Sequence, residues 1–231
     1  MSQAGVNLRL RYTLREDAQE FAHEICQLKL TQIPRQVSRA RLEFSCAGCL
    51  DSTTDIKGVK INMKKKSTYK LLVVSDSHGS DIGIRQAIEQ EGEDIDVLVH
   101  CGDMGHDIKA SLGLDYRFEI YSVTGNCDYL LPQTPEVSFK LGYFNFLVIH
   151  GHLMDVKYSN DRIIAYAKDK YADVVLFGHS HIPEIEERFG VLLVNPGSIS
   201  LPRQFSRNKT YAVVTISDDA LPKAVIREII D

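Results

Sequence analysis

Polar residues that follow directly on short apolar runs constrain this chain more than any other feature of its sequence. The first such segment is Leu71-Leu-Val-Val-Ser-Asp-Ser-His-Gly79, in which the apolar residues predict a short buried strand and Gly79 predicts a turn. Asp76 and His78 stand two residues apart, so an extended backbone points both side chains to the same side. A carboxylate and an imidazole placed together at a strand end form a candidate pair of metal ligands.

Later segments repeat this arrangement, each after an apolar run and each containing a glycine. They are Gly102-Asp103, Gly125-Asn126-Cys127-Asp128, His150-Gly151-His152 and Gly178-His179-Ser180-His181. Glycine permits tight turns and close backbone approach, so side chains from separate strands can converge on one point. One such histidine alone would be interpreted as a buried structural residue, but all of these motifs in one chain indicate a shared metal site. The candidate ligands are Asp76, His78, Asp103, Asn126, His150, His179 and His181.

The ligand types indicate both the metal and the reaction. Aspartate, asparagine and histidine suit Mn²⁺, Fe²⁺, Zn²⁺, Co²⁺ or Ni²⁺, and they suit neither a thiolate site nor an all-oxygen calcium site. The set is too large for one ion that keeps open positions, and it fits two ions that share a bridging carboxylate. Two ions about 3.5–4 Å apart clamp a phosphoryl group and activate water at neutral pH. We therefore expect phosphoester hydrolysis with two divalent ions, Mn²⁺ first among them.

Charge and composition exclude several other functions. Residues 70–231 hold 15 Lys and Arg against 24 Asp and Glu, a balance that argues against a nucleic-acid-binding surface in this part of the chain. No apolar run approaches the roughly 18 residues that span a bilayer, so we expect no membrane partner. The 5 cysteines have no spacing typical of a disulfide scaffold, which favours a reducing cytoplasm.

Two regions with different patterns predict an N-terminal appendage followed by one domain. Residues 1–62 form the predicted extension, with an amphipathic helix over about 14–30 and then a poorly patterned stretch to Asn62. Met63 looks like a second start, so our hypothesis is that the extension does not belong to the native domain at 63–231. In that domain strand and helix patterns alternate as far as Thr124, and short strands dominate afterwards, with a helix at about 160–170. This order predicts a mixed two-sheet α/β core.

From Lys70 to Asp231 the motifs resemble those of the calcineurin-like metallophosphoesterases. Gly125-Asn-Cys-Asp128 and Asn195-Pro-Gly-Ser198 are similar to the YfcE/MJ0936-like group of small bacterial and archaeal phosphodiesterases. The resemblance implies an α/β fold, a four-layer α-β-β-α sandwich of two mixed sheets with the site at their carboxyl edge. It also implies the ligand sets: Asp76, His78 and His181 for one ion, Asn126, His150 and His179 for the other, and Asp103 as the bridge.

One position departs from the pattern of the superfamily. Most members have a histidine after the asparagine, where it protonates or stabilises the leaving oxygen, and here this residue is Cys127. A thiol with a pKa of about 8.5 is a poor acid for this purpose, so we expect turnover to depend strongly on the leaving group. His152 is expected to face the substrate or to fill part of the acid role, and Asp128 to orient the loop of Asn126. Cys127 and Arg203 are candidate substrate contacts, although Arg203 fits a solvated loop equally well.

The leading functional hypothesis is a two-metal phosphodiesterase in which a hydroxide that bridges the ions attacks phosphorus in line. The residues expected in catalysis are Asp103, Asn126, Asp128, His150 and His152. A phosphomonoesterase or nucleotide pyrophosphatase with the same site is one alternative, and a protein-interaction module on the same fold, as in the retromer subunit, is another. The expected partner is a small phosphodiester or nucleotide-like substrate. Small members of such families are often homodimers or higher oligomers, although no stretch of this sequence identifies an interface.

Overall fold

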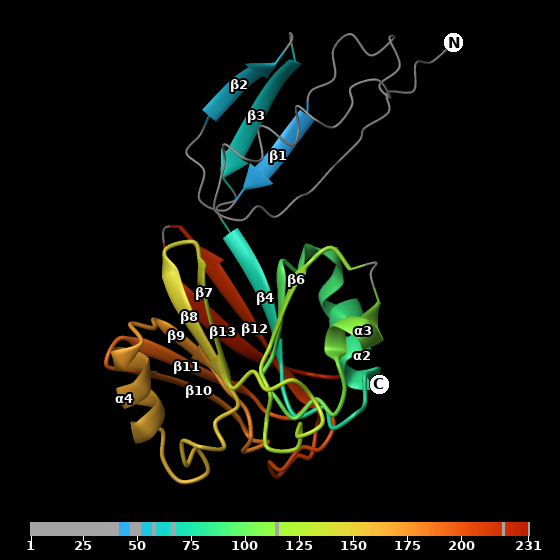
Figure 1. Cartoon of the computed structure of the whole chain (residues 1–231), viewed down its shortest axis with the longest axis vertical. Helices are drawn as coiled ribbons and strands as arrows, with labels where there is room; N and C mark the ends of the chain where they lie inside the picture. Colours follow the sequence, from blue (N-terminus) through green and yellow to red (C-terminus); the bar gives the residue numbers. More distant parts are fainter. Residues whose placement is uncertain are drawn as a thin grey trace. The chain divides into compact units, whose positions relative to one another are not determined.

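The computed structural model describes residues 42–46, 52–56, 59–65, 68–113, 116–218 and 220–230, and the chain divides into two compact units, Met1–Ser67 and Thr68–Asp231 (Figure 1). The first unit contains a sheet in the order β1 (Leu42–Cys46), β3 (Val59–Lys65), β2 (Ser52–Ile56). Strand β3 runs parallel to β1 and antiparallel to β2. The helix expected over 14–30 lies outside the described residues.

The sequence expectation for the stretch before Met63 was incomplete. The poorly patterned residues up to Asn62 include β1, β2 and most of β3. Apolar and polar residues do alternate in β1 and β3, but each alternating run is only about five residues long, and β2 is almost entirely polar, so these strands were not predicted from the sequence. Met63 lies inside β3, opposite Phe44 and Ser52, so a chain that began at Met63 would lack both strands with which β3 pairs.

The second unit contains two mixed sheets, and the first of them carries the Leu71 segment. Its order is β13 (Ala220–Glu228), β12 (Thr210–Ser217), β4 (Thr68–Val74), β5 (Val97–His100), β6 (Glu119–Ser122). Strands β4, β5 and β6 are parallel, whereas β12 and β13 add as an antiparallel pair. Strands β4 and β5 are almost completely buried, which explains why they appear in the sequence as continuous apolar runs rather than alternating ones.

The other sheet contains the strands that precede the later histidine motifs. Its order is β10 (Pro183–Arg188), β11 (Val191–Pro196), β9 (Val174–Leu176), β8 (Phe144–Ile149), β7 (Glu136–Leu141). The central strands β8, β9 and β11 are parallel, and the two outer strands are antiparallel to their neighbours. The central strands are mostly buried, whereas the outer strands β7 and β10 are partly exposed, so the core packs against the middle of this sheet.

Helices cover the outer face of each sheet, with bounds α2 (Ile82–Glu91), α3 (Ile108–Leu112) and α4 (Asp161–Asp169), and a 3₁₀ turn η2 (Gly92–Asp94) follows α2. One core cluster joins Ile84 of α2 and Ile108 of α3 to Leu72 of β4. Another joins Ile163 of α4 to Leu147 of β8. None of the helices in the part of the chain that the structure describes is long and apolar enough to cross a membrane.

The inner faces of the sheets pack against each other. Strand residues that alternate with those of the helix-facing clusters, such as Val73 and Val148, are also completely buried. At one edge the rings of Tyr121 on β6 and Phe139 on β7 stack with centroids 4.2 Å apart, and Phe139 stacks on Phe146 of β8 at 4.9 Å. The layers are therefore helix, sheet, sheet and helix, which confirms the α/β fold class expected from the sequence (Figure 1).

Loops at the carboxyl ends of the two sheets are joined by hydrogen bonds. The Ile199 backbone N–H, after β11, donates to the Ser75 carbonyl, after β4, at 3.1 Å. Between the sheets, the His179 N–H donates to the Asp76 carboxylate at 3.1 Å. The segments that follow β4, β9 and β11 therefore meet at one edge of the sandwich.

Candidate metal centre

The backbone turns sharply at the strand ends that carry the candidate ligands. Asp76, His78, Asp103, His179 and His181 all have positive φ, between 46° and 67°. This left-handed conformation is uncommon for residues other than glycine, and such strain is concentrated at functional sites because the surrounding structure must hold it in place. Here it directs side chains from separate strand ends toward one point.

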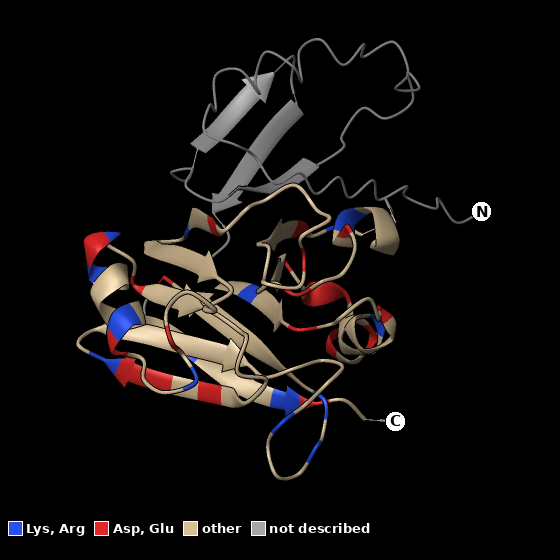
Figure 2. Ribbon diagram, turned by 60° about the horizontal axis from the view of Figure 1, so that its bottom comes forward, with Lys and Arg blue, Asp and Glu red and all other residues tan. Residues whose placement is uncertain are grey.

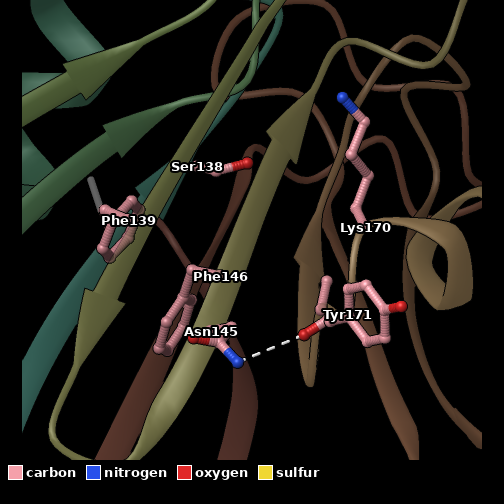
Figure 3. A pocket seen from close by; sticks show the side chains of 7 residues that line it. Ser138, Phe139, Asn145, Phe146, Lys170 and Tyr171 are labelled. Atoms are coloured by element: carbon pink, nitrogen blue, oxygen red, sulfur yellow. Dashed lines mark hydrogen bonds between the residues drawn. The ribbon is translucent and has the colours of Figure 1, made fainter.

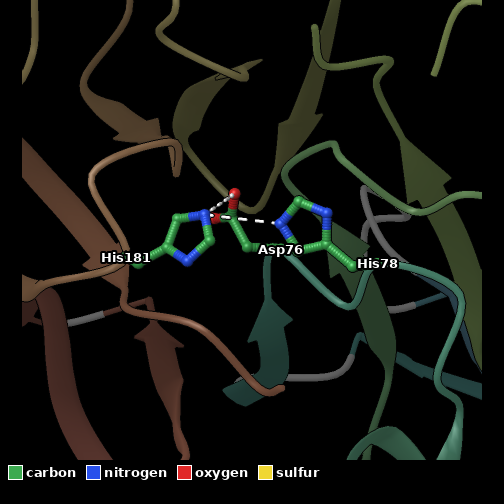
Figure 4. A group of neighbouring side chains, drawn as sticks. All are labelled: Asp76, His78 and His181. Atoms are coloured by element: carbon green, nitrogen blue, oxygen red, sulfur yellow. Dashed lines mark hydrogen bonds and ion pairs between the residues drawn. The ribbon is translucent and has the colours of Figure 1, made fainter. Parts of the chain in front are cut away.

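Asp76, His78 and His181 form one group of ligand atoms, all within 4.8 Å of one another (Figure 4). His181 Nε2 lies 3.1 Å from Asp76 Oδ1 and 3.4 Å from His78 Nε2. His181 Nδ1 lies 2.6 Å from the Leu201 carbonyl oxygen, which can only accept, so this nitrogen carries the proton. The tautomer leaves the Nε2 lone pair directed at the carboxylate and the second imidazole, as in a ligand whose other nitrogen is held by the protein.

Asp103 stands between this group and His150. Its Oδ2 atom lies 3.9 Å from His78 Nε2 and 3.5 Å from His150 Nε2, and its Oδ1 atom accepts a hydrogen bond from the Cys127 N–H at 2.7 Å. His150 Nδ1 donates to the Cys101 carbonyl at 2.7 Å, so the Nε2 lone pair of His150 points toward Asp103. One carboxylate thus faces imidazoles that come from both sheets, the arrangement a bridging ligand requires.

The remaining candidate ligands, His179 and Asn126, lie around His150 and Asp103, and so does His152. The ring of His179 packs edge-on against that of His150, with centroids 5.1 Å apart, and the ring of His152 lies 5.4 Å from it. Asn126 is exposed and its amide group contacts Cys127 Sγ at 3.3 Å. The structure therefore brings every candidate ligand of the sequence analysis to the same edge of the sandwich.

Unpartnered polar atoms test whether these residues fit a cation. Asp76 Oδ1 and His150 Nε2 are both buried, yet neither makes a hydrogen bond within the described part of the chain. Buried polar atoms without hydrogen-bond partners are costly, and a cation bound at these two atoms would remove that cost. Carboxylate oxygen and imidazole nitrogen are ligands that divalent transition metals accept, and the residues fit such an ion.

The electrostatics of the centre point the same way. Burial raises the pKa of Asp103, but His150 and the Cys127 N–H outweigh it and hold that pKa well below its usual range. Burial likewise opposes ionisation of Asp76, and its pKa is nevertheless lowered by His181, His150 and Ser75. Both carboxylates are ionised at neutral pH, so the centre offers concentrated negative charge to a cation.

Several residues that support the ligands carry no ligand signal in the sequence. Ser75 Oγ donates to Asp76 Oδ2 at 2.6 Å, and Ser198 Oγ donates to the Asp76 carbonyl at 2.8 Å. The Asn195 side chain donates to the Gly178 carbonyl at 3.0 Å, next to His179. Asn195-Pro-Gly-Ser198 was visible as a motif, but its contacts follow from loop packing and could not be assigned from spacing.

His100 organises the loop before Asp103 without facing the metal centre. It is completely buried, its Nδ1 accepts the Gly102 N–H at 3.2 Å, and its Nε2 lies 2.9 Å from Ser77 Oγ. Because Nδ1 is the acceptor, Nε2 carries the proton and donates to the serine. The ring therefore links the segments that lead to His78 and Asp103.

Cys127, Asp128 and Arg203 differ in their surroundings. Asp128 accepts hydrogen bonds from the Gly125 and Gly105 N–H groups at 2.8 and 2.7 Å, which ties the loop of Asn126 to the loop after Asp103. The Cys127 side chain is exposed, and partial burial together with the Asp103 carboxylate raises the pKa of its thiol to about 11. Arg203 is exposed and only its backbone N–H contacts the centre, donating to the His181 carbonyl at 3.1 Å.

A separate pocket opens on the sheet that contains β7 and β8 (Figure 3). Phe146 and Lys170 line it, and the Asn145 side chain donates to the Tyr171 carbonyl at 3.2 Å on its wall. None of its lining residues is a candidate ligand, so this pocket is not part of the metal centre.

Comparison with known proteins decides the family. Residues 69–219 match the model of the calcineurin-like phosphoesterase superfamily domain, which is well over half of the chain. The chain belongs to this superfamily. Among curated phosphoesterases of the superfamily, the probable metallophosphoesterase YsnB of Bacillus subtilis is 36% identical over 65% of this chain and 86% of its own length. Phosphodiesterase MJ0936 of Methanocaldococcus jannaschii is 30% identical over 55% of this chain and 82% of its own.

Solved structures with a similar fold support the architecture. A predicted phosphoesterase from Streptococcus pneumoniae superposes with a TM-score of 0.58 at 27% identity, covering 70% of this chain and 99% of its own. The Zn²⁺ complex of Vps29 from Entamoeba histolytica superposes with a TM-score of 0.56 over 69% of this chain and 99% of its own. Its identity of 18% makes it evidence for the fold alone.

Proposed function

We propose that this phosphoesterase is a two-metal phosphodiesterase. The observation that carries the proposal is the position of Asp103, whose carboxylate faces His78 on one side and His150 on the other. Asp76, His78 and His181 would hold one ion and Asn126, His150 and His179 the other, with Asp103 shared. Two divalent ions supply Lewis-acid activation of water and of the phosphoryl group at neutral pH. Mn²⁺ is the ion we expect to support activity.

The side chains of the protein contribute orientation and charge. Hydrogen bonds from Nδ1 to backbone carbonyls hold the rings of His150 and His181 so that the Nε2 atom of each faces the ion site. The rigid ionised carboxylate of Asp103 holds its position because the Cys127 N–H binds its other oxygen. Such preorganisation reduces the rearrangement needed when negative charge develops on the phosphoryl and leaving-group oxygens.

His152 is the residue that we propose for contact with the leaving group. Its Nδ1 is buried and makes no hydrogen bond within the described residues, and burial together with neighbouring His150 lowers the pKa of its ring. A neutral imidazole with one N–H can donate a hydrogen bond to an ester oxygen. Arg203 would approach the phosphate from the loop that begins beside His181.

Hydrolysis of bis-p-nitrophenyl phosphate and of p-nitrophenyl phosphate tests the proposal. Metal-stripped protein would receive Mn²⁺, Ni²⁺, Zn²⁺ or Mg²⁺, with bound ions per chain counted and Asp103→Ala as control. We expect metal-dependent turnover that favours the diester and vanishes in the variant. Preference for the monoester would replace the proposal with a phosphomonoesterase. Metal binding without turnover of either substrate would favour an interaction module.

A further inference from the structure

Cys127, which the expected assignment does not use as a metal ligand, belongs to a second group of potential ligands. Its Sγ atom, a ring nitrogen of His78 and a carboxylate oxygen of Asp103 all lie within 4.8 Å of one another. The Cys127 N–H donates to Asp103 Oδ1 at 2.7 Å, which fixes the cysteine beside this carboxylate. The sulfur is therefore placed by the same contact that holds the bridging residue.

The buried side of this group independently indicates a cation. Asp103 is 2% exposed, and the buried His150 Nε2 atom, which has no hydrogen-bond partner among the described residues, points at its Oδ2 from 3.5 Å. Asp76 Oδ1 is also buried without a hydrogen bond. A cation drawn to these atoms would reach a region that Cys127 borders from the exposed side.

We propose that Cys127 is a metal ligand that discriminates between ions: it coordinates thiophilic ions beside His78 and Asp103, and it remains a free thiol when the ions are hard. Thiolate sulfur prefers Zn²⁺, Cd²⁺ and Co²⁺, whereas Mn²⁺ and Mg²⁺ prefer oxygen. When sulfur binds, the S–H bond breaks, its electron pair forms the bond to the ion, and the proton passes to solvent. The inference rests on the proposed function only in that both place an ion at His78 and Asp103.

This ligand would have a consequence for selectivity. Cys127 is the exposed member of the group, whereas His78 is half-buried and Asp103 is buried. The thiolate therefore lies on the side from which a phosphate oxygen must approach the ions. A thiophilic ion would be bound tightly, and the Cys127 thiolate would then occupy the coordination position that the substrate needs. A hard ion would not bind the thiol, so that position would stay open to the substrate.

Cobalt spectroscopy tests the inference without reference to activity. The reference protein carries serine at Cys26, Cys46 and Cys49, so that no thiol of the N-terminal region binds the ion, and the same background carries Cys127→Ser for comparison. With Co²⁺ added, we expect a sulfur-to-cobalt charge-transfer band in the reference protein and none in the Cys127→Ser protein. Binding should also release one more proton in the reference protein. A band that persists in the Cys127→Ser protein would overturn the inference, as would its absence from the reference protein, whether or not cobalt binds.

Affinity and activity provide a second arm. We expect Cys127→Ser to weaken Zn²⁺ binding by at least roughly tenfold, the loss typical even of residues that only support a ligand, and to weaken Mn²⁺ binding less. It should also raise the ratio of Zn²⁺-supported to Mn²⁺-supported hydrolysis of bis-p-nitrophenyl phosphate. Equal losses for the two ions would contradict the inference. If the charge-transfer band appears but no metal supports hydrolysis, the inference stands and the proposed phosphodiesterase fails.

Discussion

Oδ2 of Asp103 lies 3.5 Å from Nε2 of His150, although the two residues follow strands of different sheets. Both side chains are buried, and the separation is longer than a hydrogen bond. The pair thus joins the carboxyl ends of β5 and β8 through a space that a shared cation would fill.

Replacing Asp103 with asparagine should abolish metal-dependent activity. Asn has no charge, and its amide nitrogen would be a donor where an ion needs an acceptor, so we expect metal affinity to fall by at least roughly 100-fold, the upper range for lost supporting residues. Equilibrium dialysis followed by metal analysis measures this loss. Asp169→Asn, at an exposed position near the end of α4, is the matched control. Two tightly bound ions in Asp103→Asn would remove Asp103 as the bridge.

Turnover should depend strongly on the leaving group because Cys127 stands where most relatives of the superfamily have histidine. Its thiol, with a pKa raised to about 11, is a poor proton donor to an ester oxygen. We expect diesters with aryl leaving groups, which need no proton, to react faster than alkyl diesters by about 10²–10⁴-fold beyond the difference seen without enzyme. Equal rates for the two classes would show that another residue supplies the proton. His152→Ala should slow the alkyl substrates further.

Alanine at Gly125 should disrupt the metal centre by contact alone. The glycine has an ordinary φ, but an added Cβ would lie 2.1 Å from Asp103 Oδ1 and 2.6 Å from the Asp103 nitrogen. We expect Gly125→Ala to displace Asp103 and to lower metal affinity at least roughly tenfold. The control is Gly113→Ala, where the space is open and φ is +90°; it should cost about 1–3 kcal/mol of stability through backbone strain while leaving metal affinity intact. Metal titration and urea unfolding separate these two effects.

His100 should make the metal-free fold less stable as pH falls. Burial lowers the pKa of His100 to about 4 from an ordinary value of 6.5, so between these values the unfolded chain binds a proton that the native state does not. Stability therefore decreases on acidification through this window, by about 2 kcal/mol between pH 7 and pH 5 from this residue. Urea unfolding in a chelating buffer should show a smaller pH dependence for His100→Gln than for the unchanged protein. An identical dependence would mean that His100 is not held neutral.

Tyr211 should stabilise the sheet that contains β4 and β12 through its hydrogen bond to Glu91. Its hydroxyl donates to Glu91 Oε1 at 2.9 Å, and Glu91 Oε2 forms an ion pair with Lys70 Nζ at 2.5 Å. Hydrogen bonds to charged groups contribute about 1.5–3 kcal/mol, so we expect Tyr211→Phe to lower the free energy of unfolding by about 2 kcal/mol. Tyr158→Phe, at a residue 90% exposed, is the matched control in the same urea experiment. A loss no larger than that of the control would contradict the prediction.

Most strands of the second unit, and a set of candidate ligands, could be predicted from the sequence. Apolar runs such as the one at Leu71 form strands close to the expected bounds, because a strand buried on both faces must be apolar throughout. Asp76 and His78 could be selected because they follow such a run at a turn. Strands β1, β2 and β3 were missed because the alternation of apolar and polar residues in β1 and β3 is short, and because β2 is almost entirely polar.

Which of these side chains face one another depends on the packing of the fold. Asp103 meets His150, and Ser198 holds the Asp76 carbonyl, across 122 residues in the second case. The approach of Cys127 to His78 likewise depends on how the loops after different strands pack. Periodicity reports the local environment of a residue, whereas these contacts arise from the packing of two sheets against each other. The types of ligand could therefore be predicted from the sequence, whereas the contacts between them could be assigned only from the folded structure.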